Sequence, residues 1–293
     1  MVKPKISIIS PASRPENWLG IYKNVSDTDI DFEFVYVGPN APDYELPDNF
    51  KFIKSNVKPA QCAEIAARNV TGDLIMWVAD DSLFKTSRPL DKLYETYINC
   101  HNDRAVVSAR YDHPEGWNRY VYGDLDTPLL TLHGLMSTKY WNELGGVDSR
   151  FIAVFWTEDI SMRVHASGGE IVLSEVYMDE EVEGPLKPRS RGSQLMKDHL
   201  DTDKVLLDQL WVRDGIPQFE RSMGLQKFKA TDIMPRSQEP QGRWRYQSNL
   251  VNKLMTGSTF YTLRNARASI YGRFHRFKIS RIPNYLARLI SRN

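Results

Sequence analysis

The order of apolar and polar positions along the first hundred residues predicts strands that alternate with helices. Short apolar runs rich in β-branched and aromatic residues predict strands at 5–10, 32–37, 50–55 and 74–79. Helical patterns separate these runs at 15–25, 59–73 and 88–100, and Pro15 and Pro59 suit first helical positions. Such alternation predicts an α/β domain with a largely parallel sheet that is covered on both faces.

The second hundred residues show a less regular pattern. Apolar runs predict strands at 104–111, 118–124 and 170–176, and the residues 201–215 have a helical pattern. Two short helices are predicted at 137–146 and 157–169, where Ser137 and Thr157 suit the capping position and glycines follow the last turn. The polar segment 179–193, which contains Pro and Gly, is expected to be a mobile loop.

Two adjacent carboxylates, Asp80 and Asp81, directly follow the apolar run 74–79. In open α/β sheets, ligands bind outside the carboxyl ends of the strands, which is where this pair falls. One interpretation is a site for a hard cation such as Mg²⁺, which takes one or two carboxylates together with phosphate oxygens and water. The other is a solvated acidic turn, which the sequence Asp-Asp-Ser also favours. The residues 77–84 alone leave the two interpretations equal.

A second acidic pair, Glu158-Asp159, follows Thr157 and the apolar, aromatic segment 151–156. Thr is a good helix cap, and acids in a first turn suit the helix dipole, so a structural explanation is available. The alternative is a carboxylate at the mouth of a buried wall that accepts a proton from a sugar hydroxyl.

Four short motifs occur in a fixed order: "AARN" (66–69), "ADDS" (79–82), "LGGVDSRF" (144–151) and "TEDISM" (157–162). In this order and spacing the chain resembles the inverting GT-A glycosyltransferases of glycosyltransferase family 2. The resemblance covers about residues 4–175 and extends more loosely to 215. It implies a GT-A fold, which is the Rossmann-like fold of nucleotide-diphospho-sugar transferases, with a mostly parallel central sheet.

The resemblance also implies roles for the matched residues. Asp81 would coordinate Mn²⁺ or Mg²⁺ that bridges the diphosphate of a nucleotide sugar, and Asp80 would lie near the ribose or the donor sugar. Asp159 would be the base that deprotonates an acceptor hydroxyl, and Glu158 would bind an acceptor or sugar hydroxyl. The implied enzyme is a hexosyltransferase that inverts the anomeric carbon.

The sequence departs from the family pattern at two places on the donor side. Ala79 stands where the first acid of an Asp-x-Asp motif is usual, and the segment 37–40 lacks the acidic residues that often end the second strand. The nucleotide therefore stays open between UDP-, GDP- and dTDP-sugars. The donor contacts that we expect, besides the aspartates, are Ser10, Arg14, Asn40 and Arg68.

Several further residues have both a functional and a structural interpretation. His199 is either a late metal ligand or a surface histidine, and Arg189 and Arg191 either close over the diphosphate or belong to a solvated loop. His133 and Gly134 are predicted at the floor of the acceptor site. Trp156, like Trp117 and Trp141, is either a sugar-stacking surface or part of the core.

The net charge of +1 conceals a basic C-terminal segment. Residues 241–293 contain eleven Lys or Arg and neither Asp nor Glu, which leaves a net charge of −10 on the rest of the chain. We expect a catalytic domain at 1–215, a linker at 216–240 and a basic, aromatic-rich helical extension at 241–293. The extension either binds an anionic membrane surface, near a glycan or lipid-linked acceptor, or packs on the enzyme or a subunit partner. The acidic body argues against nucleic acid.

The composition is that of a globular protein, with 41% hydrophobic and 26% charged residues, and no run approaches the length of a membrane span. The first strand begins too early for a signal peptide, and Cys62 and Cys100 suit free thiols, so we expect a cytoplasmic or peripheral membrane protein. One rival class, the sugar-phosphate nucleotidyltransferases, needs a glycine-rich loop after the first strand, but no glycine precedes Gly20. Another rival is a non-catalytic carbohydrate-binding protein on the same fold.

Overall fold

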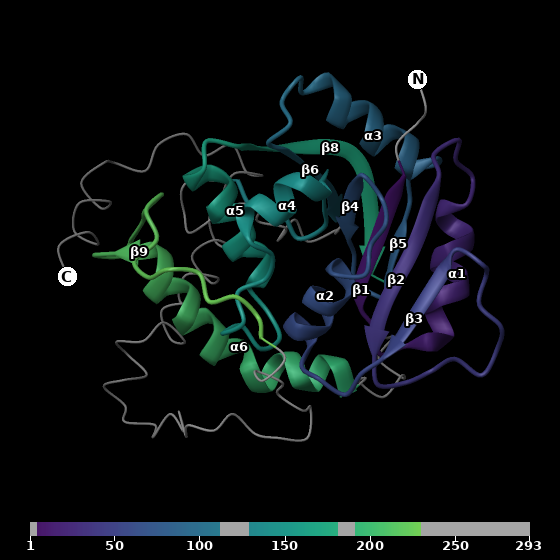
Figure 1. The fold of residues 1–293 in the computed structure, drawn as a ribbon, viewed down its shortest axis with the longest axis horizontal. Coiled ribbons are helices and arrows are strands. Elements are labelled where there is room, and N and C mark those ends of the chain that lie inside the picture. Colours follow the sequence, from purple (N-terminus) through teal and green to yellow (C-terminus); the bar gives the residue numbers. More distant parts are fainter. Residues whose placement is uncertain (1–4, 112–128, 181–190, 230–293) are drawn as a thin grey trace, which may run out of the picture. The chain divides into compact units, whose positions relative to one another are not determined.

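The computed structural model describes residues 5–111, 129–180 and 191–229, which all belong to one compact unit of the chain, Met1–Glu239 (Figure 1). The strands are β1 (Ile6–Pro11), β2 (Phe32–Gly38), β3 (Phe50–Lys54), β4 (Leu74–Trp77), β5 (Ser82–Phe84), β6 (Ala105–Tyr111), β7 (Gly134–Ser137), β8 (Glu170–Glu180), β9 (Val212–Arg213) and β10 (Ile216–Pro217). The helices are α1 (Pro15–Val25), α2 (Pro59–Ala67), α3 (Pro89–Asn99), α4 (Thr138–Leu144), α5 (Trp156–Ala166) and α6 (Arg191–Trp211).

Eight strands form one sheet in the order β3-β2-β1-β4-β7-β6-β8-β5. The strands β1 to β4 are mutually parallel, and β6 and β8 are parallel to each other. The strand β7 runs antiparallel to both of its neighbours, and β5 runs antiparallel to β8. The prediction of a mostly parallel sheet is therefore confirmed, with two strands that run in the opposite direction.

Helices cover both faces of the sheet, as the alternation of strands and helices predicted. Successive side chains of a strand point to opposite faces, so Ile8 packs with Trp18 of α1 and Leu93 of α3. Its neighbour Ile9 packs on the other face with residues of α2, α4, α5 and α6. Two hydrophobic cores, one on each side of the sheet, hold the strands in register.

Most predicted helices begin where their prolines and caps place them. The helices α1 and α2 begin at Pro15 and Pro59, and Ser137 caps α4 by accepting a hydrogen bond from the backbone N–H of Tyr140. The capping prediction for Thr157 is wrong, because α5 begins one residue earlier, at Trp156, after Phe155 in a left-handed conformation. The helix α2 ends at Ala67, six residues before the predicted end at Asp73.

The strands β5 and β7 and the hairpin β9–β10 were not predicted; each of these strands has four residues or fewer. The predicted strand at 118–124 lies outside the described residues. The predicted loop 179–193 is shorter, because β8 continues to Glu180 and α6 begins at Arg191; residues 181–190 lie outside the described part.

The first part of the predicted linker packs on the domain that precedes it. Residues 218–229, here called the C-terminal strap, lie along the segment that follows Gly146: the backbone N–H of Ser149 donates to Gln226 O, and Asp148 forms an isolated β-bridge with Lys227. The packed structure therefore extends beyond the predicted boundary at 215. The predicted extension 241–293 lies outside the described residues. Among the residues that the structure describes, no helix is long and apolar enough to cross a bilayer.

The carboxyl edge of the sheet collects both acidic pairs. The strand β4 ends there, directly before Asp80 and Asp81. The strand β8 starts at the amino edge of the sheet, because its first residue, Glu170, pairs with the first residue of the parallel strand β6. The helix α5 ends shortly before β8 starts, so its C-terminal end lies near the amino edge. Its first turn, which contains Glu158 and Asp159, therefore lies toward the carboxyl edge. The backbone N–H of Ala60, at the start of α2, donates to Ile152 O and joins these segments.

Candidate active site

Asp80 is fixed by the loop that follows β1. One carboxylate oxygen accepts hydrogen bonds from the backbone N–H groups of Ser13 and Arg14, at 2.5 and 2.7 Å. The other oxygen accepts from Nε and Nη2 of Arg14, at 3.0 and 2.6 Å. Because both oxygens are engaged and the residue is 1% exposed, Asp80 anchors the β1–α1 loop to the end of β4.

Asp81 retains access to solvent. Its side chain is 20% exposed, and its Oδ2 lies 2.7 Å from Nη1 of Arg14, so one guanidinium bridges both aspartates. The pair also acts on Tyr36 beneath it: burial, and then the negative charges of Asp80 and Asp81, raise the pKa of the phenol. Asp81 is therefore the member of the pair that can meet a ligand.

The donor set at this edge fits a cation that is shared with a ligand. Within the described ranges, no group of three or more His, Cys, Asp or Glu side chains gathers to hold a metal. Mg²⁺ and similar hard cations are often held by one or two carboxylates plus phosphate oxygens. Among the described residues, Asp81 could therefore supply one ligand to Mn²⁺ or Mg²⁺, with bound phosphate oxygens and water as the others.

The loop that leads into α5 is held by a buried carboxylate on α6. Asp203, which is 0% exposed, accepts hydrogen bonds from the backbone N–H groups of Ile152, Ala153 and Val154. Burial raises the pKa of Asp203 to about 6, against the opposing effect of these three donors. This contact sets the path of the chain just before the left-handed Phe155 and the acidic pair.

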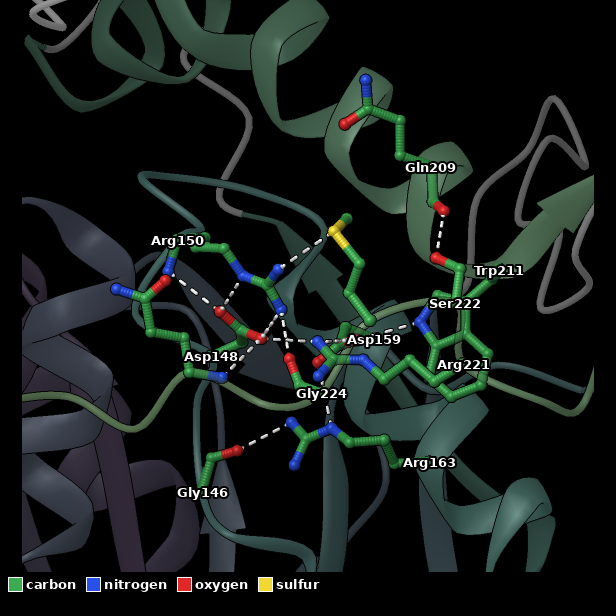
Figure 2. A network of polar contacts seen from close by, with 12 residues as sticks. Gly146, Asp148, Arg150, Asp159, Arg163, Gln209, Trp211, Arg221, Ser222 and Gly224 are labelled. Carbon is green, nitrogen blue, oxygen red and sulfur yellow. Dashed lines mark hydrogen bonds and ion pairs between the residues drawn. The ribbon is translucent and has the colours of Figure 1, made fainter.

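Asp159 lies at the centre of a buried polar network (Figure 2). Its Oδ1 accepts hydrogen bonds from Nε1 of Trp211, at 2.9 Å, and from Nη2 of Arg221, at 3.1 Å. Its Oδ2 accepts from Nε of Arg163 at 3.0 Å, and the residue is 0% exposed. Three donors thus engage both oxygens, and the carboxylate joins α5 to the end of α6 and to the C-terminal strap.

Asp148, the aspartate of the "GGVD" turn, extends this network (Figure 2). Arg150 donates to it from Nε and Nη2, at 3.0 and 2.7 Å, and Arg221 donates from Nη2 at 2.5 Å. Although burial opposes ionisation, the hydrogen bonds from Arg150 and Arg221 lower the pKa of Asp148 to about 2. Arg221 therefore bridges Asp148 and Asp159.

Glu158 has a different environment from its neighbour. Its side chain is half-buried, and Oε2 accepts a hydrogen bond from the Thr157 hydroxyl at 2.7 Å. Burial raises the pKa of Glu158, while the Thr157 hydroxyl and the charge of Lys204 on α6 act in the opposite direction. Of the two acids, Glu158 is thus the one that keeps access to solvent, whereas Asp159 is fully buried.

The other predicted residues of the carboxyl edge differ in exposure. Ser10 is buried at the end of β1, whereas Asn40 is exposed and donates to Ser13 O, next to the Asp80 anchor. His133 is 5% exposed, and burial lowers its pKa to about 4, so its ring is neutral at neutral pH. Gly134 packs under Trp77, since a Cβ there would meet the indole at 2.4 Å.

Trp156 belongs to the core. It is 7% exposed, and its ring lies 6.5 Å from that of Trp77, the last residue of β4. Trp141 is also buried against Trp77, and Trp117 lies outside the described residues. The structural interpretation of Trp156 and Trp141 therefore agrees with their burial, and the contact through Trp77 ties α5 to the strand that presents Asp81.

The placement of Arg68 corrects its assignment to the donor site. Arg68 follows the last residue of α2, and its Nε donates to Glu64 while Nη2 donates to Phe228 O in the C-terminal strap. The next residue, Asn69, accepts from Lys51 near the start of β3, at the amino edge of the sheet. Because α2 returns the chain from one edge to the other, Arg68 lies opposite Asp81.

His199 contacts a buried lysine. Its Nε2 lies 3.1 Å from Nζ of Lys58, and both residues are 2% exposed. Burial, and then the charge of Lys58, lower the pKa of His199. An adjacent ammonium opposes a second cation, and His199 does not join the aspartates in a metal-binding group of the described residues, so its metal assignment gains no support. Arg189 and the side chain of Arg191 lie outside what the structure describes.

Four structural residues of this region were missed at the sequence level: Lys58, Asp203, Trp211 and Arg221. Each contacts a partner between 50 and 141 positions away. An isolated Lys, Asp or Arg of this kind gives no local signal, because its partner is set by tertiary packing. For Trp211 alone there was a general signal, because a buried Trp N–H usually finds a hydrogen-bond acceptor.

Comparisons with known proteins place the fold. No protein-family model matches the chain, and a search of curated proteins gives no match. Solved structures of glycosyltransferases do match, so the chain has a glycosyltransferase fold.

One of these structures is the mannosyltransferase PcManGT from Pyrobaculum calidifontis in complex with GDP-Man and Mn²⁺. The TM-score is 0.52 at 16% identity, over 74% of this chain and 66% of that one, so the match spans just under two thirds of the mannosyltransferase. Another is S. aureus TarS 1-349, with a TM-score of 0.48 and 14% identity over 72% of this chain and 76% of that one.

Proposed function

We propose that this chain transfers a sugar from a nucleoside-diphosphate donor to a hydroxyl group of an acceptor, with inversion at the anomeric carbon. The observation that carries the proposal is the location of both acidic pairs at the carboxyl edge of a glycosyltransferase-type sheet. Asp81 is accessible at the end of β4, and the Glu158-Asp159 pair lies in the first turn of α5. Asp81 is suited to bind the donor, and the Glu158-Asp159 pair is suited to act on the acceptor.

On the donor side, Asp81 and Arg14 meet the diphosphate. Mn²⁺ or Mg²⁺, held by Asp81 and the diphosphate, would neutralise negative charge on the leaving group. The guanidinium of Arg14, fixed by Asp80, is a second cationic group beside it. Asn40 is exposed at the end of β2 and is proposed to contact the nucleoside, as is the adjacent Arg14 loop.

On the acceptor side, a carboxylate of α5 takes the proton of the attacking hydroxyl. The acceptor oxygen forms a bond to the anomeric carbon while the bond from that carbon to the phosphate oxygen breaks. The nucleoside diphosphate leaves with the electron pair of that bond. A base on the face opposite the leaving group produces inversion in one displacement, and general-base catalysis of this kind typically contributes about 10²–10⁴-fold to the rate.

The donor nucleotide is proposed to be a UDP-, GDP- or dTDP-sugar, and the acceptor a glycan or a lipid-linked saccharide. The basic segment 241–293 supports a position at an anionic, cytoplasmic membrane surface, because each basic residue near such a surface contributes about 1 kcal/mol. A nucleotidyltransferase is disfavoured because β1 is followed by "ASRPENW" instead of a glycine-rich loop.

Donor binding tests the proposal directly. We expect at least one nucleotide sugar to raise the melting temperature of the full chain by about 5 °C at saturating concentration with Mn²⁺. Asp81→Ala should remove most of this shift, because the cation loses its protein ligand. Asp27→Ala, at an exposed acid just after α1, is the control and should behave like the natural chain. An equal shift in Asp81→Ala, or no shift with any nucleotide sugar, contradicts the proposal.

A further inference from the structure

The two acids of α5 are neighbours in sequence but face different surroundings. Successive residues of an α-helix point about 100° apart, so Glu158 and Asp159 do not share a set of contacts. Asp159 contacts Trp211 and the arginines Arg163 and Arg221, whereas Glu158 accepts a hydrogen bond from the Thr157 hydroxyl. This difference separates the tasks that the two carboxylates can perform.

Asp159 is poorly placed to accept a proton from a substrate. It is 0% exposed, and its two oxygens already accept three hydrogen bonds, two of them from guanidinium groups. Protonation of this carboxylate would leave the buried guanidinium of Arg163 without its counter-charge and would remove one of the two carboxylates that Arg221 bridges, which is costly in a protein interior. The contacts of Asp159 are those of a structural anchor that fixes α5 against α6 and the C-terminal strap.

Glu158 combines partial exposure with a position at the carboxyl edge of the sheet. Its half-buried carboxylate accepts a hydrogen bond from the Thr157 hydroxyl, and it stands in the first turn of α5, at the carboxyl edge shared with Asp81. Partial burial favours the protonated form of a carboxyl group, which makes its carboxylate a stronger base. The nearby charges are Lys204 on α6 and Asp159 on α5.

We propose that Glu158 is the general base of the transfer and that Asp159 is the positioning residue that holds α5 in place. This inference rests on the proposed glycosyl transfer and reverses the order of tasks that the sequence resemblance implies. The acceptor O–H bond breaks, its proton moves to a carboxylate oxygen of Glu158, and the acceptor oxygen bonds to the anomeric carbon. The bond from that carbon to the donor phosphate breaks, and the nucleoside diphosphate leaves with the electron pair.

The test compares Glu158→Gln with Asp159→Asn in steady-state assays of the full chain with its donor. Glu158→Gln should lower kcat about 10²–10⁴-fold, with the donor-induced melting shift and the melting temperature of the free protein unchanged. Asp159→Asn should lower the melting temperature and retain more kcat than Glu158→Gln. Glu175→Gln, at a glutamate whose side chain is 79% exposed on β8, is the matched control and should retain full activity.

Two further variants keep the test informative if Asp159→Asn does not fold. Glu158→Asp should retain partial activity with a shifted acidic limb of the profile of kcat/KM against pH. Trp211→Phe removes one donor to Asp159 without changing either acid, and should lower stability while that acidic limb stays in place. The inference is overturned if Glu158→Gln has the kcat of the natural chain. It is also overturned if the acidic limb of the profile of kcat/KM against pH shifts in Trp211→Phe but not in Glu158→Asp. If the natural chain turns over no donor, the proposed transfer itself has failed.

Discussion

We expect Asp148→Asn to lower the free energy of unfolding by about 3 kcal/mol, because breaking a buried ion pair leaves charges without their partner. Asp148 is 0% exposed and accepts hydrogen bonds from the side chains of Arg150 and Arg221 (Figure 2). The amide can accept at one oxygen only and turns its NH₂ group toward a guanidinium. Chemical denaturation at pH 7 measures the loss.

The acid dependence of Asp148 gives a second measure of the same network. Its pKa of about 2 lies below the ordinary 3.8, so its ionisation stabilises the fold fully above about pH 4. This contribution, about 2 kcal/mol, is lost as the pH falls toward 2, so the difference in stability between the natural chain and Asp148→Asn should shrink there. The control is Asp179→Asn, whose exposed pair with Lys85 should contribute less than about 1 kcal/mol. Equal losses in both variants would contradict the account.

We expect Asp203→Ala to lower the free energy of unfolding by about 4 kcal/mol, because three backbone N–H groups lose their acceptor and each unsatisfied buried donor costs about 1–3 kcal/mol. These donors belong to residues 152–154, just before α5. Transfer should therefore weaken as well, since the loop positions Glu158. Asp201→Ala, at an exposed position of the same helix, is the control and should change stability by less than about 0.5 kcal/mol.

The substitution Asp203→Asn separates the hydrogen bonds from the charge. The pKa of Asp203 is raised to about 6 from 3.8, so the folded state binds the proton more tightly than the unfolded state. The natural chain should gain stability as the pH falls from about 6 to 4, by up to about 3 kcal/mol. Asp203→Asn should lack this gain when unfolding is followed at both pH values. An identical pH dependence of the two proteins would show that Asp203 is not the titrating group.

The elements with local signals were predictable from the sequence. Pro15 and Pro59 mark the starts of α1 and α2, and Ser137 caps α4 as its position indicated. Phe155 gave no such signal, because a left-handed phenylalanine is held by its surroundings, among them the Asp203 contact to the preceding residues. The strand β7 was missed because its pairing with β4 and β6 is long-range.

The candidate site was predictable in its location and less so in its details. The position of Asp80 and Asp81 after β4 follows from the order of strands, but the contact of Arg14 with both acids depends on the folded β1–α1 loop. The placement of Arg68 could have been foreseen, since a helix between parallel strands must return to the amino edge. The surroundings of Asp159 could not, because Trp211 and Arg221 lie 52 and 62 positions away in the sequence.

The most direct measurement of the central claim is the release of nucleoside diphosphate from a panel of UDP-, GDP- and dTDP-sugars by the full chain, with Mn²⁺ and a mixture of glycan acceptors. We expect that one donor is cleaved, that a chelator suppresses the reaction, and that Asp81→Ala lowers the rate at least about tenfold, which corresponds to about 1.4 kcal/mol of lost transition-state stabilisation. A folded chain that cleaves none of these donors, or an Asp81→Ala variant that cleaves them at the natural rate, would contradict it.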